Sequence, residues 1–124
     1  MLTNSSLLKE HGYVNGKWVG DDAKSRFDVT NAYSNEVIST LPEMGKKETD
    51  EAIEAANNAW PEWKARTAKE RSIILKKWFD LIMANQEDLA ILMTAEQGKP
   101  IAEARGEVGY GASFIEWFAE EGKR

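Results

Sequence analysis

The sequence has no cysteine, one histidine and three prolines among its 124 residues. Without cysteine, the chain can form no disulfide, no thiolate metal site and no cysteine nucleophile. The single histidine, His11, has no second histidine to complete a metal or acid–base site, and we interpret it as an exposed surface residue. Long apolar runs are also absent, because no stretch approaches the ~18 residues that a membrane-spanning helix needs. Residues 1–12 lack the basic and apolar segments of a signal peptide, so we expect a soluble, cytoplasmic protein.

The sequence also has no large excess of charge of one sign, since its formal net charge is only −5. A mildly acidic surface of mixed charges argues against nucleic acid and against an anionic membrane as partners. The composition, 42% hydrophobic and 30% charged, is that of an ordinary globular protein and not of a disordered chain. The length fits one domain or less, with a core of modest size.

The first third of the chain has the pattern of β-strands and turns. Asn15-Gly16 separates two short apolar runs, and both residue types tolerate the positive φ that a tight hairpin turn needs. Further strand patterns follow at residues 27–30 and 37–41. We therefore expect a β-hairpin region over residues 12–42, preceded by a flexible N-terminal tail over residues 1–11.

The rest of the chain has helical periodicity. Thr49 can begin the first helix, and Pro61 is expected to end or kink it. Thr67 and Glu70 form a capping box, and Gly98 can end a helix in the left-handed conformation. The expected helices cover about 49–60, 67–85, 87–97 and 100–121.

Apolar stripes on the first three helices predict their buried faces. Tryptophans at helical spacing are interpreted as core residues. The predicted buried residues are Ile53, Ala56, Trp60 and Trp63 on the first helix, Ile74, Leu75, Trp78, Phe79, Leu81 and Ile82 on the second, and Leu89, Leu92 and Met93 on the third.

The fourth helix is apolar on more sides than the rest of this chain can cover. One stripe contains Val108, Ala112, Ile115 and Ala119, and aromatic residues (Tyr110, Phe114, Trp117, Phe118) occupy much of the remainder. A helix of this kind is normally buried on most faces. Its three glycines each cost about 1 kcal/mol relative to alanine, which suggests close approach of a backbone or ligand. We expect a partner, or a longer chain, to cover this helix.

No motif in the sequence forms a complete active site. Gly98-Lys99 resembles part of a phosphate-binding loop, but Met93 and Pro100 occupy positions where that motif needs Gly and Ser or Thr. Carboxylates at Glu116, Glu120 and Glu121 could form an acid–base pair, although a solvated helix end is the favoured interpretation. We therefore predict no catalytic and no cofactor-binding residue in this chain.

Several motifs resemble the N-terminal portion of the aldehyde dehydrogenase superfamily. Residues 13–18 (Tyr-Val-Asn-Gly-Lys-Trp) look like its opening hairpin, and residues 29–38 look like its next element, with Ala32 in place of a usual proline. Residues 67–71 also fit. The most specific stretch is 96–100 (Glu-Gln-Gly-Lys-Pro) with the residues after it to 124, which is similar to the succinate-semialdehyde dehydrogenase branch.

The resemblance implies a mostly α-helical fragment with an N-terminal β-hairpin. Residues 12–124 would be an incomplete N-terminal part of the NAD(P)-binding domain of an α/β enzyme. By position in the family motif, substrate-tunnel residues would be Gly106, Tyr110, Ser113 and Phe114. The carbonyls of Val29 and Thr30, with Glu96, match a structural monovalent-cation site of some relatives, several of which have Asp where this chain has Glu96.

The resemblance also implies what this chain does. The family's catalytic cysteine, general-base glutamate and oxyanion asparagine fall beyond the matching residues. The parent enzyme would use NAD or NADP to oxidise an aldehyde, succinate semialdehyde, to the acid. The isolated chain would be inactive and would bind no cofactor tightly. Its partners would be the remainder of the chain and further copies in a homo-oligomer. The alternative is a stand-alone helical interaction module that self-associates through its C-terminal helix.

Overall fold

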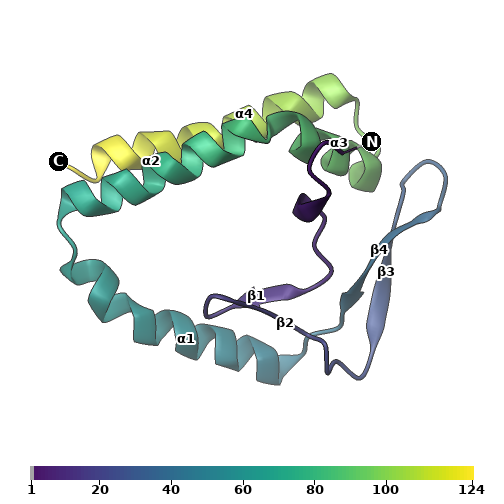
Figure 1. Cartoon of the computed structure of the whole chain (residues 1–124), viewed down its shortest axis with the longest axis horizontal. Helices are drawn as coiled ribbons and strands as arrows, with labels where there is room; N and C mark the ends of the chain where they lie inside the picture. Colours follow the sequence, from purple (N-terminus) through teal and green to yellow (C-terminus); the bar gives the residue numbers. More distant parts are fainter. Residues whose placement is uncertain (1) are drawn as a thin grey trace.

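The computed structural model describes residues 2–124, so Met1 of the predicted tail lies outside the described residues. The chain forms an open frame, with the helix pair α2 and α4 on one side and α1 on the opposite side (Figure 1). The elements, in order, are the 3-10 helix η1 (Ser5–Leu7), β1 (Gly12–Val14), β2 (Lys17–Val19), β3 (Arg26–Thr30), β4 (Val37–Pro42), α1 (Lys46–Ala65), α2 (Ala68–Ala84), α3 (Gln86–Gln97) and α4 (Ile101–Glu121). The prediction of a mostly helical chain with an N-terminal β-hairpin is confirmed.

The β region consists of two separate antiparallel sheets of two strands each. Asn15 and Gly16 join β1 to β2 with φ angles of 51° and 77°, as expected for a hairpin turn with two left-handed residues. The second sheet pairs β3 with β4 and has a register irregularity between Val29 and Thr30. Region 12–42 is therefore two hairpins in sequence.

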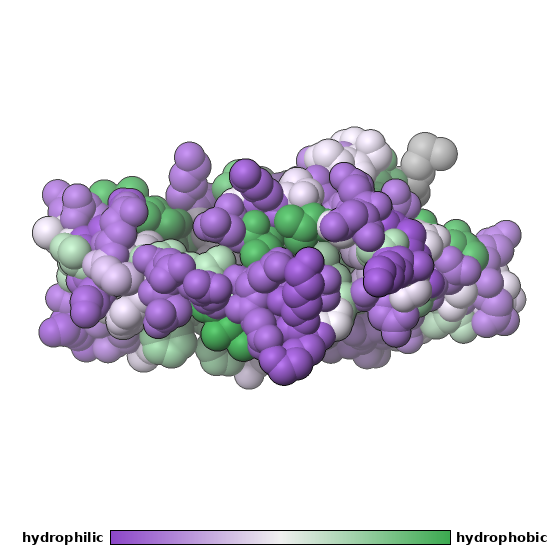
Figure 2. Space-filling model, turned by 90° about the horizontal axis from the view of Figure 1, so that it is seen from below, coloured by the Kyte–Doolittle hydropathy of each residue, from purple (hydrophilic) through white to green (hydrophobic). Residues whose placement is uncertain are grey.

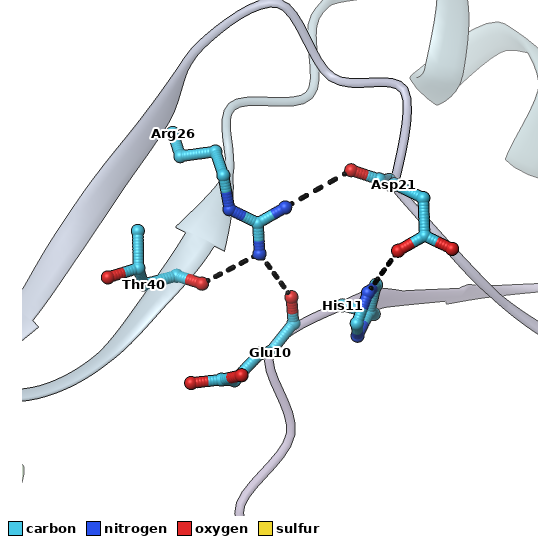
Figure 3. A network of polar contacts seen from close by, with 6 residues as sticks. Glu10, His11, Asp21, Arg26 and Thr40 are labelled. Atoms are coloured by element: carbon cyan, nitrogen blue, oxygen red, sulfur yellow. Dashed lines mark hydrogen bonds and ion pairs between the residues drawn. The ribbon is translucent and has the colours of Figure 1, made fainter.

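One arginine connects the start of the second sheet to its surroundings. The Arg26 guanidinium donates to the carbonyl oxygens of Glu10 and Thr40, both at 2.9 Å, and to that of Gly20 at 3.2 Å (Figure 3). Beside this group, Nε2 of His11 lies 2.7 Å from a carboxylate oxygen of Asp21. His11 is half-buried, so the interpretation as a simple exposed residue was wrong.

The first helix is longer at both ends than its sequence predicts. It begins at Lys46, where the Glu48 carboxylate accepts the N–H of Gly45 at 2.9 Å, and continues through Pro61 to Ala65. The expectation that Pro61 ends or kinks the helix at about residue 60 was wrong in its end point. Proline removes one backbone hydrogen bond, and because this part of α1 is exposed, water can hydrate the carbonyl that is left.

The other predicted helix signals are confirmed. Glu70 accepts the N–H of Thr67 at 2.7 Å, and the Thr67 hydroxyl accepts the N–H of Glu70 at 3.3 Å, which completes the capping box. Gly98 ends α3 with φ 76°. Pro100 then precedes α4 as its N-cap residue.

The core lies where α4 packs against α2 and α3. Small side chains fill it: Ala90, Ala104 and Ala112 are at most 1% exposed, and Val108 is 8% exposed. Ile82, Leu89, Met93 and Ile101 pack around the cluster. On α4 the stripe that contains Val108, Ala112, Ile115 and Ala119 is the one that packs inward. The prediction of Leu89 and Met93 as core contacts of α3 is confirmed.

Several residues predicted as core are exposed. On α1, Ile53 and Trp60 are 64% and 55% exposed, and on α2 Trp78 is 55% exposed. Ile74 and Leu81 are exposed too. Leu75, Phe79 and Ile82 of α2 are partly buried, as predicted, and they lie on the same side of the helix as the buried Ser72. On α2 apolar residues occupy more than one face, so periodicity alone could not select the face that packs. On α1 the apolar stripe stays largely exposed because this helix meets little of the described chain.

Apolar side chains therefore remain on the surface between polar ones, as Figure 2 shows for one face of the molecule. Within residues 2–124, none of the helices is long and apolar enough to cross a membrane. Exposed apolar area of this extent marks surfaces that contact other protein.

Candidate functional site

The outer face of α4 contains all four residues predicted to line a substrate tunnel. Gly106, Tyr110, Ser113 and Phe114 are spaced four, three and one residues apart, which places them on one side of a helix. Tyr110 is 67% exposed and Phe114 is 47% exposed. A Cβ added at Gly106 would meet no atom within 4 Å. The structure brings these residues together on a face that the described chain leaves uncovered.

Two aromatic residues of this face, Tyr110 and Phe114, pack against each other. The rings of Tyr110 and Phe114 lie 4.9 Å apart at 78°, an edge-to-face contact that aromatic pairs favour. The Ser113 hydroxyl donates to the Tyr110 carbonyl at 2.7 Å, so its proton is engaged within the helix. An open depression of ≈ 960 Å³ lies beside them and is lined by Lys76, Tyr110, Ser113, Phe114, Glu116, Trp117, Phe118, Glu120, Glu121 and Arg124.

The carboxylates at the end of α4 are ion-paired. Hydrogen bonding from Lys123, with a smaller contribution from Lys76 at 3.7 Å, holds the pKa of Glu120 below its ordinary value. Glu121 lies 3.5 Å from Arg124. A general acid near neutral pH needs a raised carboxyl pKa, so this arrangement favours the interpretation as a solvated helix end.

The residues predicted as cation ligands come from two elements that meet. The N–H of Ala32, just after β3, donates to the carbonyl of Ala95 near the end of α3 at 3.0 Å. Val29 and Thr30 belong to that strand, and Glu96 is exposed on the last turn of the helix. Oxygen donors beside a helix C-terminus suit a hard cation. Among residues 2–124, no three or more His, Cys, Asp or Glu residues cluster as a metal site.

The described residues do not fit the phosphates of a dinucleotide. Such cofactors bind at a helix N-terminus beyond the carboxyl edge of a parallel sheet, and both sheets of residues 2–124 are antiparallel pairs. Each α-helix also has an acidic residue in its first turn: Glu48, Glu70, Glu87 with Asp88, and Glu103. These carboxylates would repel a phosphate at all four helix N-termini.

The sequence analysis did not predict two features of the structure. A second depression of ≈ 600 Å³ lies between the first hairpin and α1, and its lining mixes Lys24, Lys47, Glu43 and Glu51. The other is Asp88, a buried carboxylate that accepts hydrogen bonds from the N-terminal segment. An acidic residue in a first helical turn is common, so no local signal could have distinguished this one.

Known proteins resemble this chain in both sequence and backbone structure. It is 56% identical over 123 residues to a glutarate-semialdehyde dehydrogenase of Pseudomonas putida and 54% identical over 123 residues to the NADP-dependent succinate-semialdehyde dehydrogenase of Escherichia coli. Each match covers 99% of this chain and 26% of the relative. The chain therefore spans about a quarter of the length of the curated relatives it matches.

A solved structure agrees with these sequence matches. The crystal structure of succinate-semialdehyde dehydrogenase from Burkholderia pseudomallei superposes with a TM-score of 0.95 at 53% identity and covers 99% of this chain and 26% of that chain. The model of the aldehyde dehydrogenase family matches residues 18–124. The resemblance inferred from the motifs is thus confirmed, and the chain belongs to the aldehyde dehydrogenase family.

Proposed function

We propose that this chain is the N-terminal segment of an NAD(P)-dependent aldehyde dehydrogenase that oxidises succinate semialdehyde to the acid. The observation that carries the proposal is the identity of 56% and 54% to semialdehyde dehydrogenases of which the chain spans only 26%. The uncovered outer face of α4 supports it, because the remainder of a longer enzyme would bury this face. The relatives in question are those named for glutarate and succinate semialdehyde, and both of these compounds carry one carboxylate at the end of the chain opposite the aldehyde.

In this proposal the chain contributes part of the substrate passage and no catalytic group. Gly106, Tyr110, Ser113 and Phe114 would line the tunnel, where a glycine leaves room for the substrate and two aromatic rings form an apolar wall. Val29, Thr30 and Glu96 would hold a structural monovalent cation. NAD or NADP, bound outside these residues, would accept the hydride, and the enzyme would work as a cytoplasmic homo-oligomer.

The isolated chain would not oxidise an aldehyde. The chemistry needs a strong nucleophile such as a thiolate, and the sequence contains no cysteine. Residues 2–124 also offer no arrangement that fits dinucleotide phosphates, as their four helix N-termini are acidic.

The first experiment is to sequence the coding DNA past codon 124. The proposal expects the reading frame to continue for several hundred codons and to include a cysteine after a glycine-rich segment. The protein made from that frame should then reduce NAD or NADP with succinate semialdehyde, with glutarate semialdehyde as the competing substrate. Activity of the 124-residue chain alone would contradict the proposal.

A second candidate function is self-association as an interaction module. It is favoured by the exposed aromatic residues of α4, of which Trp117 is 62% and Phe118 59% exposed. Light scattering over a range of concentrations tests this candidate. A chain that stays monomeric at high concentration would eliminate it.

A further inference from the structure

The buried carboxylate of Asp88 binds the start of the chain. Asp88 is 5% exposed, and its two oxygens accept the N–H groups of Thr3 at 2.8 Å and of Asn4 at 2.7 Å. These partners are 85 and 84 residues away along the chain. Two consecutive backbone donors on one anion make a bidentate, charge-assisted contact, which is among the stronger kinds of protein hydrogen bond.

The local structure leaves this carboxylate available for a distant partner. Asp88 is the third residue of α3, where the helix dipole favours a negative charge. The N-cap residue, Asn85, makes no side-chain hydrogen bond to the helix. The N–H groups of Thr3 and Asn4 hold the pKa of the Asp88 carboxyl below its ordinary value, which agrees with an anion at this position.

The segment that Asp88 holds is also fixed at its other end. Asn4 accepts hydrogen bonds from the N–H and the hydroxyl of Ser6 through its side chain, which caps η1. Further on, the carbonyl of Glu10 accepts from Arg26 at 2.9 Å, and the same nitrogen of Arg26 also donates to the Thr40 carbonyl (Figure 3). Residues 2–11 are thus anchored to α3 at one end and to the second sheet at the other.

We propose that Asp88 is a positioning residue that anchors residues 2–11, the N-terminal strap, across the frame between α3 and the β region. In Figure 1 the strap runs from the end of the chain beside α3 to β1. It thereby adds a second link between α3 and the β region, besides the hydrogen bond from Ala32 to Ala95. This proposal concerns the chain's own architecture and does not depend on the proposed enzymatic function.

Amide hydrogen exchange of the full chain, followed at single residues, tests the anchor. In the wild type, the amides of Thr3 and Asn4 should exchange more slowly than free-chain amides. Asp88→Asn keeps the shape and removes the charge, and it should accelerate both amides about tenfold or more while α4 keeps its protection. The matched control is Asp80→Asn, the same change at an exposed site on α2, and it should leave both amides unchanged.

A second pair of variants acts from the strap, so that it does not disturb the core. Thr3→Pro removes the N–H that Asp88 accepts, and it should raise the pKa of the Asp88 carboxyl in NMR titration and accelerate exchange at Asn4. Thr3→Ser keeps the N–H and the hydroxyl and should do neither. If Asp88→Asn also exposes α3 and α4, the Thr3 pair decides the question. Free-chain exchange at Thr3 and Asn4 in the wild type, or a Thr3→Pro variant that matches the wild type, would overturn the proposal.

Discussion

The inner face of α4 carries small residues, whereas its outer face carries large aromatic ones. Ala104 and Ala112 are at most 1% exposed, while Tyr110 is 67% and Trp117 62% exposed. Small residues on the inner face allow helices to pack closely within this chain. The outer face keeps most of its apolar area for a contact outside it. The exposed fractions in this chain therefore identify the contact made by the inner face of α4, but not the contact that its outer face would make.

The largest expected effect separates the two faces by stability. Ala104→Asp buries an unpaired charge between α3 and α4 and should destabilise the chain by about 3 kcal/mol or more. Tyr110→Asp on the outer face should cost less than about 1 kcal/mol, since it loses mainly its contact with Phe114. Urea unfolding of both variants measures the difference. Equal losses would mean that the outer face is also buried within this chain.

A second prediction uses Gly106, which lies on the outer face with no atom near its absent Cβ. In the isolated chain, Gly106→Leu should stabilise α4 by about 0.5–1 kcal/mol, because glycine is a poor helix former. In the complete enzyme the same side chain would enter the proposed tunnel, and kcat/KM for succinate semialdehyde should fall about 100-fold. Gly106→Ala is the control and should keep most of the activity. An enzyme unaffected by Gly106→Leu would remove this residue from the tunnel.

A third prediction concerns association through the exposed apolar faces. Trp117→Glu on α4 and Trp78→Glu on α2 should each weaken any self-association of the isolated chain about tenfold or more. Asn58→Glu adds the same charge to an exposed polar position of α1 and serves as the control. Sedimentation velocity gives the association constants. If the control weakens association as much as the tryptophan variants, general charge repulsion and not the apolar faces would be responsible.

The smallest expected effect is on the pH dependence of stability, through the ion pair between Arg105 on α4 and Glu87 on α3. Arg105 donates to both carboxylate oxygens of Glu87, at 2.7 and 3.0 Å, and these hydrogen bonds lower the pKa of Glu87 from its ordinary 4.5. A lowered folded-state pKa contributes stability above about pH 4.5, which is lost as the pH falls through the folded-state value.

Glu87→Gln should therefore reduce stability at pH 7 and change it little at pH 3. Urea midpoints at the two pH values measure this contribution, which is small because the pair is partly exposed. Glu54→Gln, at an exposed position of α1, is the control. An equal loss at both pH values would show that the ion pair is not its cause.

Local signals predicted the elements better than they predicted the packing. The capping box at Thr67, the turn at Asn15-Gly16 and the stop at Gly98 each depend on residues that are neighbours in the sequence, and all three are confirmed. The end of α1 was wrong because Pro61 costs only one hydrogen bond on an exposed helix. The prediction for α2 was right at Leu75, Phe79 and Ile82 and wrong at Ile74, Trp78 and Leu81, because both sets form stripes of similar regularity.

In the candidate site, too, local features were predicted from the sequence and long-range contacts were not. The family motif placed Gly106, Tyr110, Ser113 and Phe114 along α4, and helical geometry then puts them on one side of it. Their role as tunnel residues stays a prediction, as does the cation site at Val29, Thr30 and Glu96. The contact of Asp88 with Thr3 and Asn4 could not have been predicted. These partners lie 85 and 84 positions earlier in the sequence, and no pattern near Asp88 indicates them.

The sequence by itself determined which segments are helices or hairpins, where most of them end, and to which family the chain belongs. These properties depend on backbone conformations, caps and motifs formed by residues close together in the chain. Only the tertiary structure decided which apolar face of α2 and α4 is buried, that the apolar stripe of α1 stays largely exposed, and which carboxylate holds the N-terminal strap. These outcomes depend on which residues each surface contacts in space, and the local periodicity of either partner does not determine that contact.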